Sequence, residues 1–254
     1  MMERYALITG ASGGTGLEIA RRFAKEGWNV VVTSRRQEEA EAVAKTLEET
    51  FGIKARGVKS SAGNEAEVTA VFDQLKADGW MISALVLNAA HLGIGQTALD
   101  VPLDEWREVL ETNLVWNFSL MRESARHMKE IGGGSIVIIG SNTARRAIPD
   151  RSSYIASKGR LVSPSKALAV EWGEYGIRVN VVVSGSIKTA RWAAQTEEWR
   201  QIRRDRSPIG DIADFEDLAN ISYFLASDEA RIITGAEVVV DGGVDAQFLP
   251  KNAP

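Results

Sequence analysis

The chain has 254 residues, of which 44% are hydrophobic and 25% charged, with a formal net charge of −4. This composition is ordinary for a soluble globular protein with a sizeable core, and α/β chains of this length often form one domain. The small negative charge disfavours a nucleic-acid-binding surface or a polybasic membrane contact, because both need an excess of Lys and Arg. The chain contains no cysteine, which excludes disulfides, thiolate metal ligands and a thiol nucleophile.

The N-terminal sequence bears on the cellular compartment in which the protein acts. An apolar strand pattern begins at Tyr5, which leaves no room for a basic region, an apolar stretch and a cleavage site. No apolar stretch reaches the length of about 18 residues that a membrane span needs. We therefore expect a cytoplasmic protein without a membrane or nucleic-acid partner.

Short runs rich in Val and Ile alternate with longer amphipathic stretches, a pattern typical of parallel strands joined by crossover helices. The predicted strands are 6–9, 30–33, 55–58, 84–87, 135–139, 178–182 and 237–240, and the helices between them include 15–26, 38–49, 65–76, 103–129 and 153–174. No repeat or linker divides the chain. The sequence thus predicts one α/β domain over 1–254, with a doubly wound, parallel seven-stranded sheet and helices on both faces.

The segment 189–214 departs from this alternation. It carries Trp192, Trp199 and five arginines, and no strand pattern occurs within it. A helical lid over a substrate pocket is the favoured interpretation. The alternative is an exposed helical excursion that serves only for packing.

A glycine-rich turn follows the first predicted strand and precedes the first helix. Gly10 permits the sharp turn, Gly14 lets the backbone approach a pyrophosphate, and Gly16 lets the helix approach the strand. Unpaired N–H groups and the helix dipole then favour bound phosphates, although glycines also occur where a loop merely needs positive φ. The position at the first strand-to-helix junction favours a dinucleotide of the Rossmann type. The expected contacts are Gly10, Ser12, Gly13, Gly14, Thr15 and Gly16.

The second strand ends in Ser34-Arg35-Arg36 rather than in an acidic residue. A carboxylate there would accept hydrogen bonds from the ribose hydroxyls of NAD, whereas arginine pairs with a 2′-phosphate. These residues therefore favour NADP(H). The alternative is that the two arginines are solvated residues at the start of a helix.

Four polar residues suggest acid–base chemistry. Tyr154 and Lys158 lie four apart at the start of a predicted helix, so a cation lies one turn from a phenol and would lower its pKa. Ser141 follows an apolar strand at its carboxyl end, where α/β sheets place ligands. Asn113 lies in the preceding long helix, where a buried amide could hold a water on Lys158. Singly, the pair could be surface neighbours, Ser141 a cap and Asn113 a solvent-facing amide.

In order and spacing these motifs resemble the short-chain dehydrogenase/reductase family over essentially the whole chain. Ile187 and Thr189 after the sixth strand, and the ending 233–243, match as well. The resemblance implies that Asn113, Ser141, Tyr154 and Lys158 form a catalytic tetrad. It also implies that Lys158 binds the nicotinamide ribose, while Ile187 and Thr189 contact the carboxamide.

The chain departs from the family pattern at three places. The family's Asn-Asn-Ala-Gly after the fourth strand is Leu87-Asn88-Ala89-Ala90 here, the Asp expected near the adenine is Ser61, and the Pro-Gly after the sixth strand is Ser184-Gly185. Cofactor contacts are still expected at Ser61, Asn88, Ala89 and Gly185, with altered detail.

The predicted activity is hydride transfer between NADP(H) and a carbonyl or secondary alcohol. The alternatives are a dinucleotide-sensing protein without chemistry and a Rossmann-type epimerase or dehydratase. A steroid, a sugar-derived ketone and an acyl ketone suit the sequence equally, and His91 and His127 lack metal-ligand spacing. The candidate pocket residues are His91, Asn142, Arg145, Arg146, Ile148, Arg151, Trp192 and Trp199. Helices 103–129 and 153–174 resemble the family's dimerisation pair, so a homotetramer is expected.

Overall fold

The computed structural model describes residues 3–62 and 64–249. Its sheet has seven strands, all parallel, in the order β3-β2-β1-β4-β5-β6-β7. The strands are β1 Tyr5–Ile8, β2 Asn29–Ser34, β3 Ala55–Lys59, β4 Ala84–Leu87, β5 Gly134–Ile139, β6 Ile177–Ser184 and β7 Glu237–Val240. This confirms the predicted doubly wound parallel sheet, and the strand ends differ from the predicted ones by a few residues at most.

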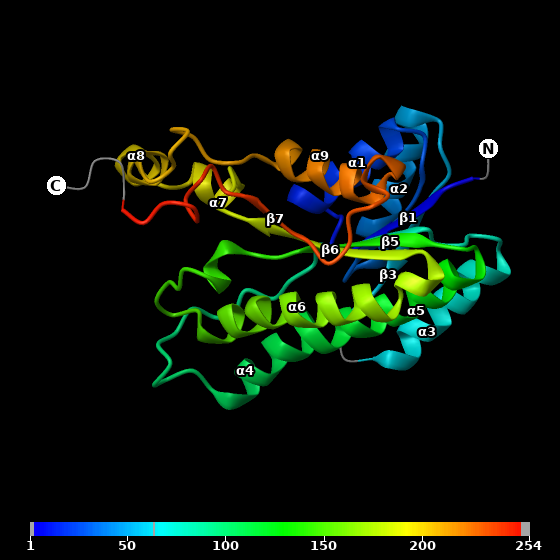
Figure 1. The fold of residues 1–254 in the computed structure, drawn as a ribbon, viewed down its shortest axis with the longest axis horizontal. Helices are drawn as coiled ribbons and strands as arrows, with labels where there is room; N and C mark the ends of the chain where they lie inside the picture. The colour runs from blue at the N-terminus through cyan, green and yellow to red at the C-terminus, as the bar shows by residue number, and fades with distance from the viewer. Residues whose placement is uncertain (1–2, 63, 250–254) are drawn as a thin grey trace.

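Helices cover both faces of the sheet (Figure 1). One face carries α1 Gly14–Lys25, α2 Gln37–Phe51 and α9 Phe215–Ala226, and the other carries α3 Glu65–Ala77, α4 Leu103–Leu110, α5 Trp116–Glu130 and α6 Ser152–Glu171. Two short helices, α7 Ala190–Ala193 and α8 Glu197–Asp205, lie beyond the carboxyl end of β6. Among the described residues, no helix is both long and apolar enough to cross a membrane.

The strands are apolar throughout because successive side chains enter two different cores. In β1, Leu7 belongs to the core beneath α3, α5 and α6, whereas Ala6 and Ile8 belong to the core beneath α1, α2 and α9. The same alternation holds along β5. A strand buried on both faces reads as a continuous apolar run, which is why the pattern predicted these strands well.

The predicted long helix 103–129 is interrupted by a π-helical turn at Glu111–Val115. The turn joins α4 to α5 and contains the fully buried Asn113. A π-turn adds one residue to the helix and often marks a functional position. It was not predicted, because the apolar periodicity continues through it.

The strand order reverses between β1 and β4. From β1 the chain proceeds outward to β2 and β3, and from β4 it proceeds to β5, β6 and β7 on the other side. The loops after β1 and β4 therefore diverge and leave a crevice at the carboxyl edge of the sheet. Ligands of open α/β sheets bind at this point.

Candidate active site

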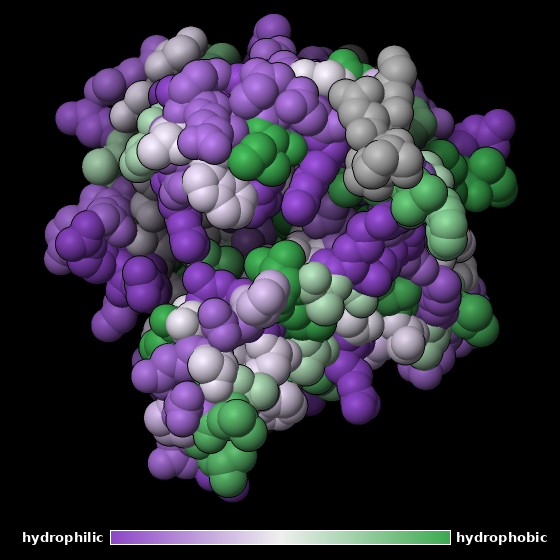
Figure 2. All heavy atoms as spheres, turned by 90° about the vertical axis from the view of Figure 1, so that its left-hand side faces the viewer, coloured by the Kyte–Doolittle hydropathy of each residue, from purple (hydrophilic) through white to green (hydrophobic). Residues whose placement is uncertain are grey.

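A cavity of about 950 Å³ lies at the carboxyl edge of the sheet. Figure 2 faces this edge and shows a hollow in the middle of the surface. The wall includes most of the residues that the sequence singled out: Gly10, Ser12, Thr15, Ser34, Arg35, Ser61, Asn88, Ala89, Ser141, Tyr154, Lys158, Gly185 and Ile187. Residues from six strand ends thus meet in one elongated site.

The glycine turn has the geometry that a dinucleotide needs. Gly10 has φ +63°, and a Cβ on Gly16 would lie 2.4 Å from the Gly10 carbonyl oxygen, so neither position accepts a side chain without strain. Gly13 precedes α1, and no side chain among the described residues caps the N–H groups of the helix's first turn. These donors, together with the helix dipole, fit a bound pyrophosphate.

The loop after β4 is fastened to this turn. The Thr9 hydroxyl accepts hydrogen bonds from the backbone N–H of Asn88 (2.9 Å) and of Ala89 (3.0 Å). The Asn88 amide donates in return to the carbonyls of Thr9 (3.0 Å) and Gly10 (3.2 Å). Asn88 therefore holds the two walls of the crevice together, besides lining the cavity.

The far end of the cavity carries a carboxylate that the sequence analysis missed. Glu39 lines the wall beside Ser34 and Arg35, accepts a hydrogen bond from the Ser34 hydroxyl (2.8 Å), and pairs with Arg36. Arg36 is not on the cavity wall, whereas Arg35 is. No local pattern pointed to Glu39, because it reaches the site from the first turn of α2.

The catalytic candidates converge at the other end. Tyr154 and Lys158 lie in the first two turns of α6, and the Lys158 Nζ is 5.9 Å from the centroid of the Tyr154 ring. Lys158 is buried and donates to the carbonyl of Ile139 at 2.7 Å. Ser141 follows β5 and its Oγ lies 2.8 Å from the Thr143 hydroxyl. The sheet edge thus holds the hydroxyl, the phenol and the ammonium around one space.

Burial shifts both titratable groups. It raises the pKa of Tyr154, while a hydrogen bond from Ser141 and the charge of Arg151 lower it. Burial also lowers the pKa of Lys158 to about 8. Ionisable groups with such shifts in a cleft are typical of acid–base sites.

Asn113 bridges the loop after β4 and helix α6. Its Oδ1 accepts from the backbone N–H of His91 (2.7 Å), and its Nδ2 donates to the His91 carbonyl (2.8 Å) and to the Ser157 hydroxyl (2.9 Å). The amide is therefore buried and not solvent-facing. The two N–H groups are used in these contacts, so the expected water on Lys158 stays a prediction.

The residues after β6 form the third side of the site. A Cβ on Gly185 would lie 2.5 Å from the Cβ of Asp241, which explains the glycine. Ile187 forms a β-bridge with Ala213, and the Thr189 hydroxyl accepts from the N–H of Trp192 at 3.2 Å. Thr189 caps α7 and, like Gly13, Gly14 and Gly16, is not on the cavity wall.

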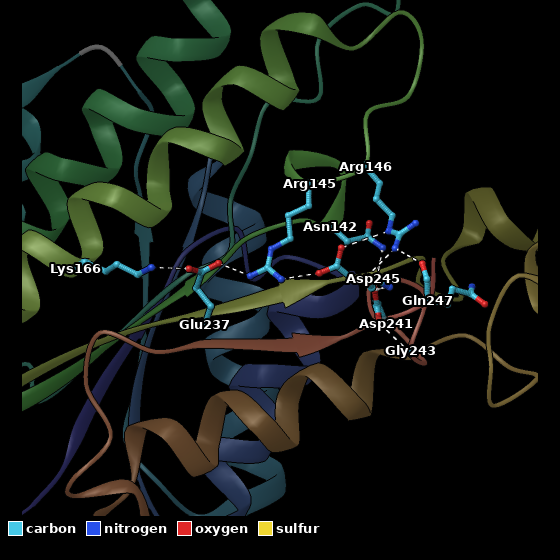
Figure 3. A network of polar contacts seen from close by, with 9 residues as sticks. All are labelled: Asn142, Arg145, Arg146, Lys166, Glu237, Asp241, Gly243, Asp245 and Gln247. Carbon is cyan, nitrogen blue, oxygen red and sulfur yellow. Dashed lines mark hydrogen bonds and ion pairs between the residues drawn. The ribbon is translucent and has the colours of Figure 1, made fainter. Parts of the chain in front are cut away.

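Most of the candidate substrate residues lie elsewhere. Of the eight, only His91 lines the cavity. Arg145 pairs with Glu237 and Asp245, and Arg146 binds Asp245 and the Gln247 carbonyl, as Figure 3 shows. Neither arginine lies on the wall of this cavity, and both neutralise carboxylates of β7 and the C-terminal segment. The remaining five, Asn142, Ile148, Arg151, Trp192 and Trp199, are also off the wall.

Several wall residues went unrecognised in the sequence. They are Thr33, Glu39, Ser60, Ala62, Ala90, Leu92, Glu108, Glu111, Thr112, Trp116, Ile139, Gly140 and Ser184. Those at strand ends could have been found from the strand prediction alone. The wall residues from α4, the π-helical turn and α5 could not be found in this way, because their position at the cavity depends on how the helices pack.

Comparison with known proteins agrees with this geometry. A family model described as "Enoyl-(Acyl carrier protein) reductase" matches residues 10–245. The chain is 37% identical to the NADP-dependent (R)-specific alcohol dehydrogenase of Lentilactobacillus kefiri, over 96% of this chain and 97% of that protein. It is 34% identical to the D-threitol dehydrogenase of Mycolicibacterium smegmatis, over 94% and 92% of the two chains.

Solved structures give the same result. A gluconate 5-dehydrogenase from Burkholderia cenocepacia J2315, in complex with NADP and tartrate, superposes with a TM-score of 0.91 at 29% identity, over 97% of each chain. Both the fold and the sequence likeness span nearly the full length of this chain. The chain belongs to the short-chain dehydrogenase/reductase family.

Proposed function

We propose that the protein is an NADP(H)-dependent oxidoreductase that interconverts a carbonyl and a secondary alcohol of a small molecule, with Tyr154 as the acid and base. The observation that carries the proposal is the convergence of Ser141, Tyr154 and Lys158 on the wall of a cavity that also contains the glycine turn. Relatives named as alcohol and threitol dehydrogenases support chemistry at a CH–OH group.

The nicotinamide, when bound, supplies or accepts the hydride. In the reduction direction the hydroxyls of Ser141 and Tyr154 hydrogen-bond the carbonyl oxygen, and Tyr154 donates its proton as negative charge develops there. Lys158 is a buried cation near neutral pH and favours the phenolate that remains. Asn113 supports this arrangement indirectly, because it ties the helix of Tyr154 and Lys158 to the loop at His91.

An intact acid–base set argues against a sensor without chemistry. An epimerase or dehydratase of the wider Rossmann group would ordinarily carry a longer substrate domain, whereas the chain here is covered from 10 to 245 by one family model. The oxidoreductase is thus the function best supported. The protein is further proposed to act in the cytoplasm on a small-molecule substrate, without nucleic acid.

Arg35 supports NADP(H) over NAD(H). It lines the cavity beside Ser34 at the end of β2, and no carboxylate of the described residues lies within ion-pair distance of it. A relative named as NADP-dependent and a neighbour solved with NADP agree with this choice. Glu39 limits the preference, because its carboxylate lies on the same wall, accepts a hydrogen bond from Ser34 and pairs with Arg36.

Cofactor choice tests the proposal. A charge-assisted bond to the 2′-phosphate predicts a kcat/KM ratio of roughly ten- to a hundredfold in favour of NADPH over NADH with a panel of ketones. Arg35→Asp is expected to reverse the order, because a carboxylate repels the phosphate and accepts from free ribose hydroxyls.

Arg36→Asp is the matched control, because Arg36 is adjacent to Arg35 in the chain but pairs with Glu39 and does not line the cavity. It is expected to change the ratio much less than Arg35→Asp. Equal kcat/KM values for the two cofactors in the unmodified protein would contradict the assignment of Arg35. No cofactor oxidation with any ketone would contradict the function itself.

A further inference from the structure

The loop that joins Ser141 to Tyr154 runs over the surface of the protein. Ser141 begins a short 3-10 turn, Asn142–Ala144, and residues 145–150 after the turn are exposed. Exposed loops are ordinarily mobile, whereas a group that takes part in a reaction must be held in place. The loop therefore needs support from another segment.

The hydroxyl of Ser141 takes its position from this turn. It lies 2.8 Å from the Thr143 hydroxyl and accepts a hydrogen bond from the Thr143 N–H at 3.3 Å. The carbonyl of Ser141 accepts from the N–H of Ala144 at 3.1 Å. A displacement of the turn would therefore displace Ser141, which lines the cavity.

The two residues that follow the turn are bound to the C-terminal segment, residues 241–249, as Figure 3 shows. Arg145 pairs with Oδ2 of Asp245 at 2.6 Å, and Nε of Arg146 lies 3.4 Å from Oδ1 of the same carboxylate. Arg146 also donates to the Asp245 carbonyl at 2.7 Å and to the carbonyl of Gln247. One aspartate thus binds both arginines of the loop.

Asp245 is itself fixed to the sheet. Its N–H donates to the carboxylate of Asp241 at 2.8 Å, and Asn142 in the turn donates to the same carboxylate at 3.4 Å. Asp241 is buried, follows β7 and lies against Gly185 of the cavity wall. The Asp245 side chain is only 17% exposed, so solvent screens its ion pairs less than pairs on the open surface. A continuous path of contacts therefore leads from β7 to the loop of Ser141.

We propose that Asp245 is a positioning residue, which holds the turn of Ser141 through Arg145 and Arg146 and so presents the Ser141 hydroxyl to the substrate carbonyl. This inference rests on the proposed function, because Ser141 acts there as a donor to the carbonyl oxygen. Asp245 is not on the cavity wall. Its effect is therefore expected on the chemical step and not on the binding of NADPH.

Asp245→Asn tests the proposal, because it removes the charge that binds the two arginines and keeps the size of the side chain. We expect kcat to fall about ten- to a hundredfold, the order of effect of a displacement of about 1 Å near the reacting atoms. The affinity for NADPH, measured by fluorescence titration, should not change. Asp245→Glu keeps the carboxylate and should restore part of kcat. An unchanged kcat in Asp245→Asn would overturn the proposal.

Glu237→Gln is the matched control. Glu237 also pairs with Arg145, but it lies in β7 and its other partner is Lys166. The variant takes one carboxylate from the same arginine and leaves Asp245 with both of its partners. It is expected to leave kcat as it is. An equal loss of kcat in Glu237→Gln would overturn the assignment to Asp245.

A double-mutant cycle shows whether Asp245 acts through Ser141. Asp245→Asn and Ser141→Ala are each expected to lower kcat, and the double variant is expected to be no slower than Ser141→Ala alone. A general loosening of the fold would instead lower kcat by the product of the two separate factors. That result would contradict a role of Asp245 in placing Ser141.

Hydrogen exchange gives a readout that does not need turnover. In Asp245→Asn the amides of residues 143–146, which are hydrogen-bonded within the turn, should exchange faster, while those of β5 should keep their rates. If they do so but the unmodified protein oxidises no NADPH with any ketone, the support of the loop stands and the proposed function fails.

The opposite results are equally distinct. If the unmodified protein turns over and Asp245→Asn changes neither the exchange rates nor kcat, the function stands and the inference is overturned. Faster exchange with an unchanged kcat would reduce Asp245 to a structural contact and would overturn it as well.

Discussion

Lys158 is a buried cation at the centre of the site, and its contact is with a backbone carbonyl rather than a carboxylate. Burial lowers its pKa from 10.5 to about 8, so the folded state disfavours the charged form. Below pH 8 Lys158 is protonated in both the folded and the unfolded chain, so the full free-energy cost of burying its charge opposes folding. Between pH 8 and 10.5 the folded chain loses the proton first, and stability rises with pH.

Replacing Lys158 with Met should therefore stabilise the fold and damage the function. The shift corresponds to about 3 kcal/mol, less about 1 kcal/mol for the lost hydrogen bond, so urea unfolding at pH 7 should show a gain of roughly 2 kcal/mol. The gain should shrink as the pH rises toward 10. NADPH affinity and turnover should both fall, and unchanged cofactor affinity would contradict a contact with the ribose.

Tyr154→Phe removes only the transferable proton. Turnover should disappear while NADPH affinity, measured by fluorescence titration, stays within a few-fold of the parent. The phenol is in the first turn of α6, so a ring without hydroxyl should leave the helix intact. Residual turnover above about a tenth of the parent's would contradict the acid–base assignment.

At the scale of elements, the glycine turn and α1 approach each other more closely than side chains allow. A Cβ on Gly16 would lie 2.4 Å from the Gly10 carbonyl oxygen and 2.6 Å from the Asn88 amide. Gly16→Ala should lower the free energy of unfolding by about 1–3 kcal/mol and weaken NADPH binding.

Gly13→Ala is the matched control for Gly16→Ala, because both glycines belong to the same turn. A Cβ there meets nothing within 4 Å, and the backbone is extended with φ −178°. Chemical unfolding should place this variant within about 0.5 kcal/mol of the parent. Equal destabilisation by the two alanines would show that the close approach at Gly16 does not matter.

Some helices, strands and turns could be predicted from the sequence, and others could not. The strands were predictable because both sheet faces are buried, and the glycine turn because it lies between an apolar strand and a helix. The π-turn at Asn113 could not be predicted from the sequence, since it depends on contacts with His91 and Ser157 from distant segments. Glu39 and the ion pairs of Arg145 and Arg146 likewise arise only when separate elements meet.

At the scale of the whole molecule, α5 and α6 keep apolar side chains on the surface. Trp116, Leu120 and Leu161 are buried in the core, but Phe118 is 42% and Val170 is 83% exposed. Exposed apolar residues on the two long helices fit an interface between copies of the chain. We therefore propose the homotetramer that the sequence predicts.

Light scattering at micromolar concentration should give four times the chain mass of 27.6 kDa. Phe118→Asp together with Val170→Asp should lower that mass, because a charge would be buried in the interface. Ile232→Asp replaces an equally exposed apolar residue, 86% accessible, outside both helices, and should leave the mass unchanged. A monomeric mass for the parent would contradict the assembly.

The central claim is that the cavity aligns a nicotinamide with a carbonyl beside Tyr154. Label transfer tests it most directly: the protein is incubated with a reducible ketone and NADPH that carries deuterium at C4 on one face of the ring. The account predicts an alcohol that is one mass unit heavier, with the deuterium on the carbinol carbon, from one of the two C4-labelled cofactors only. NADPH that binds in the cavity but gives no labelled alcohol from either would contradict the account.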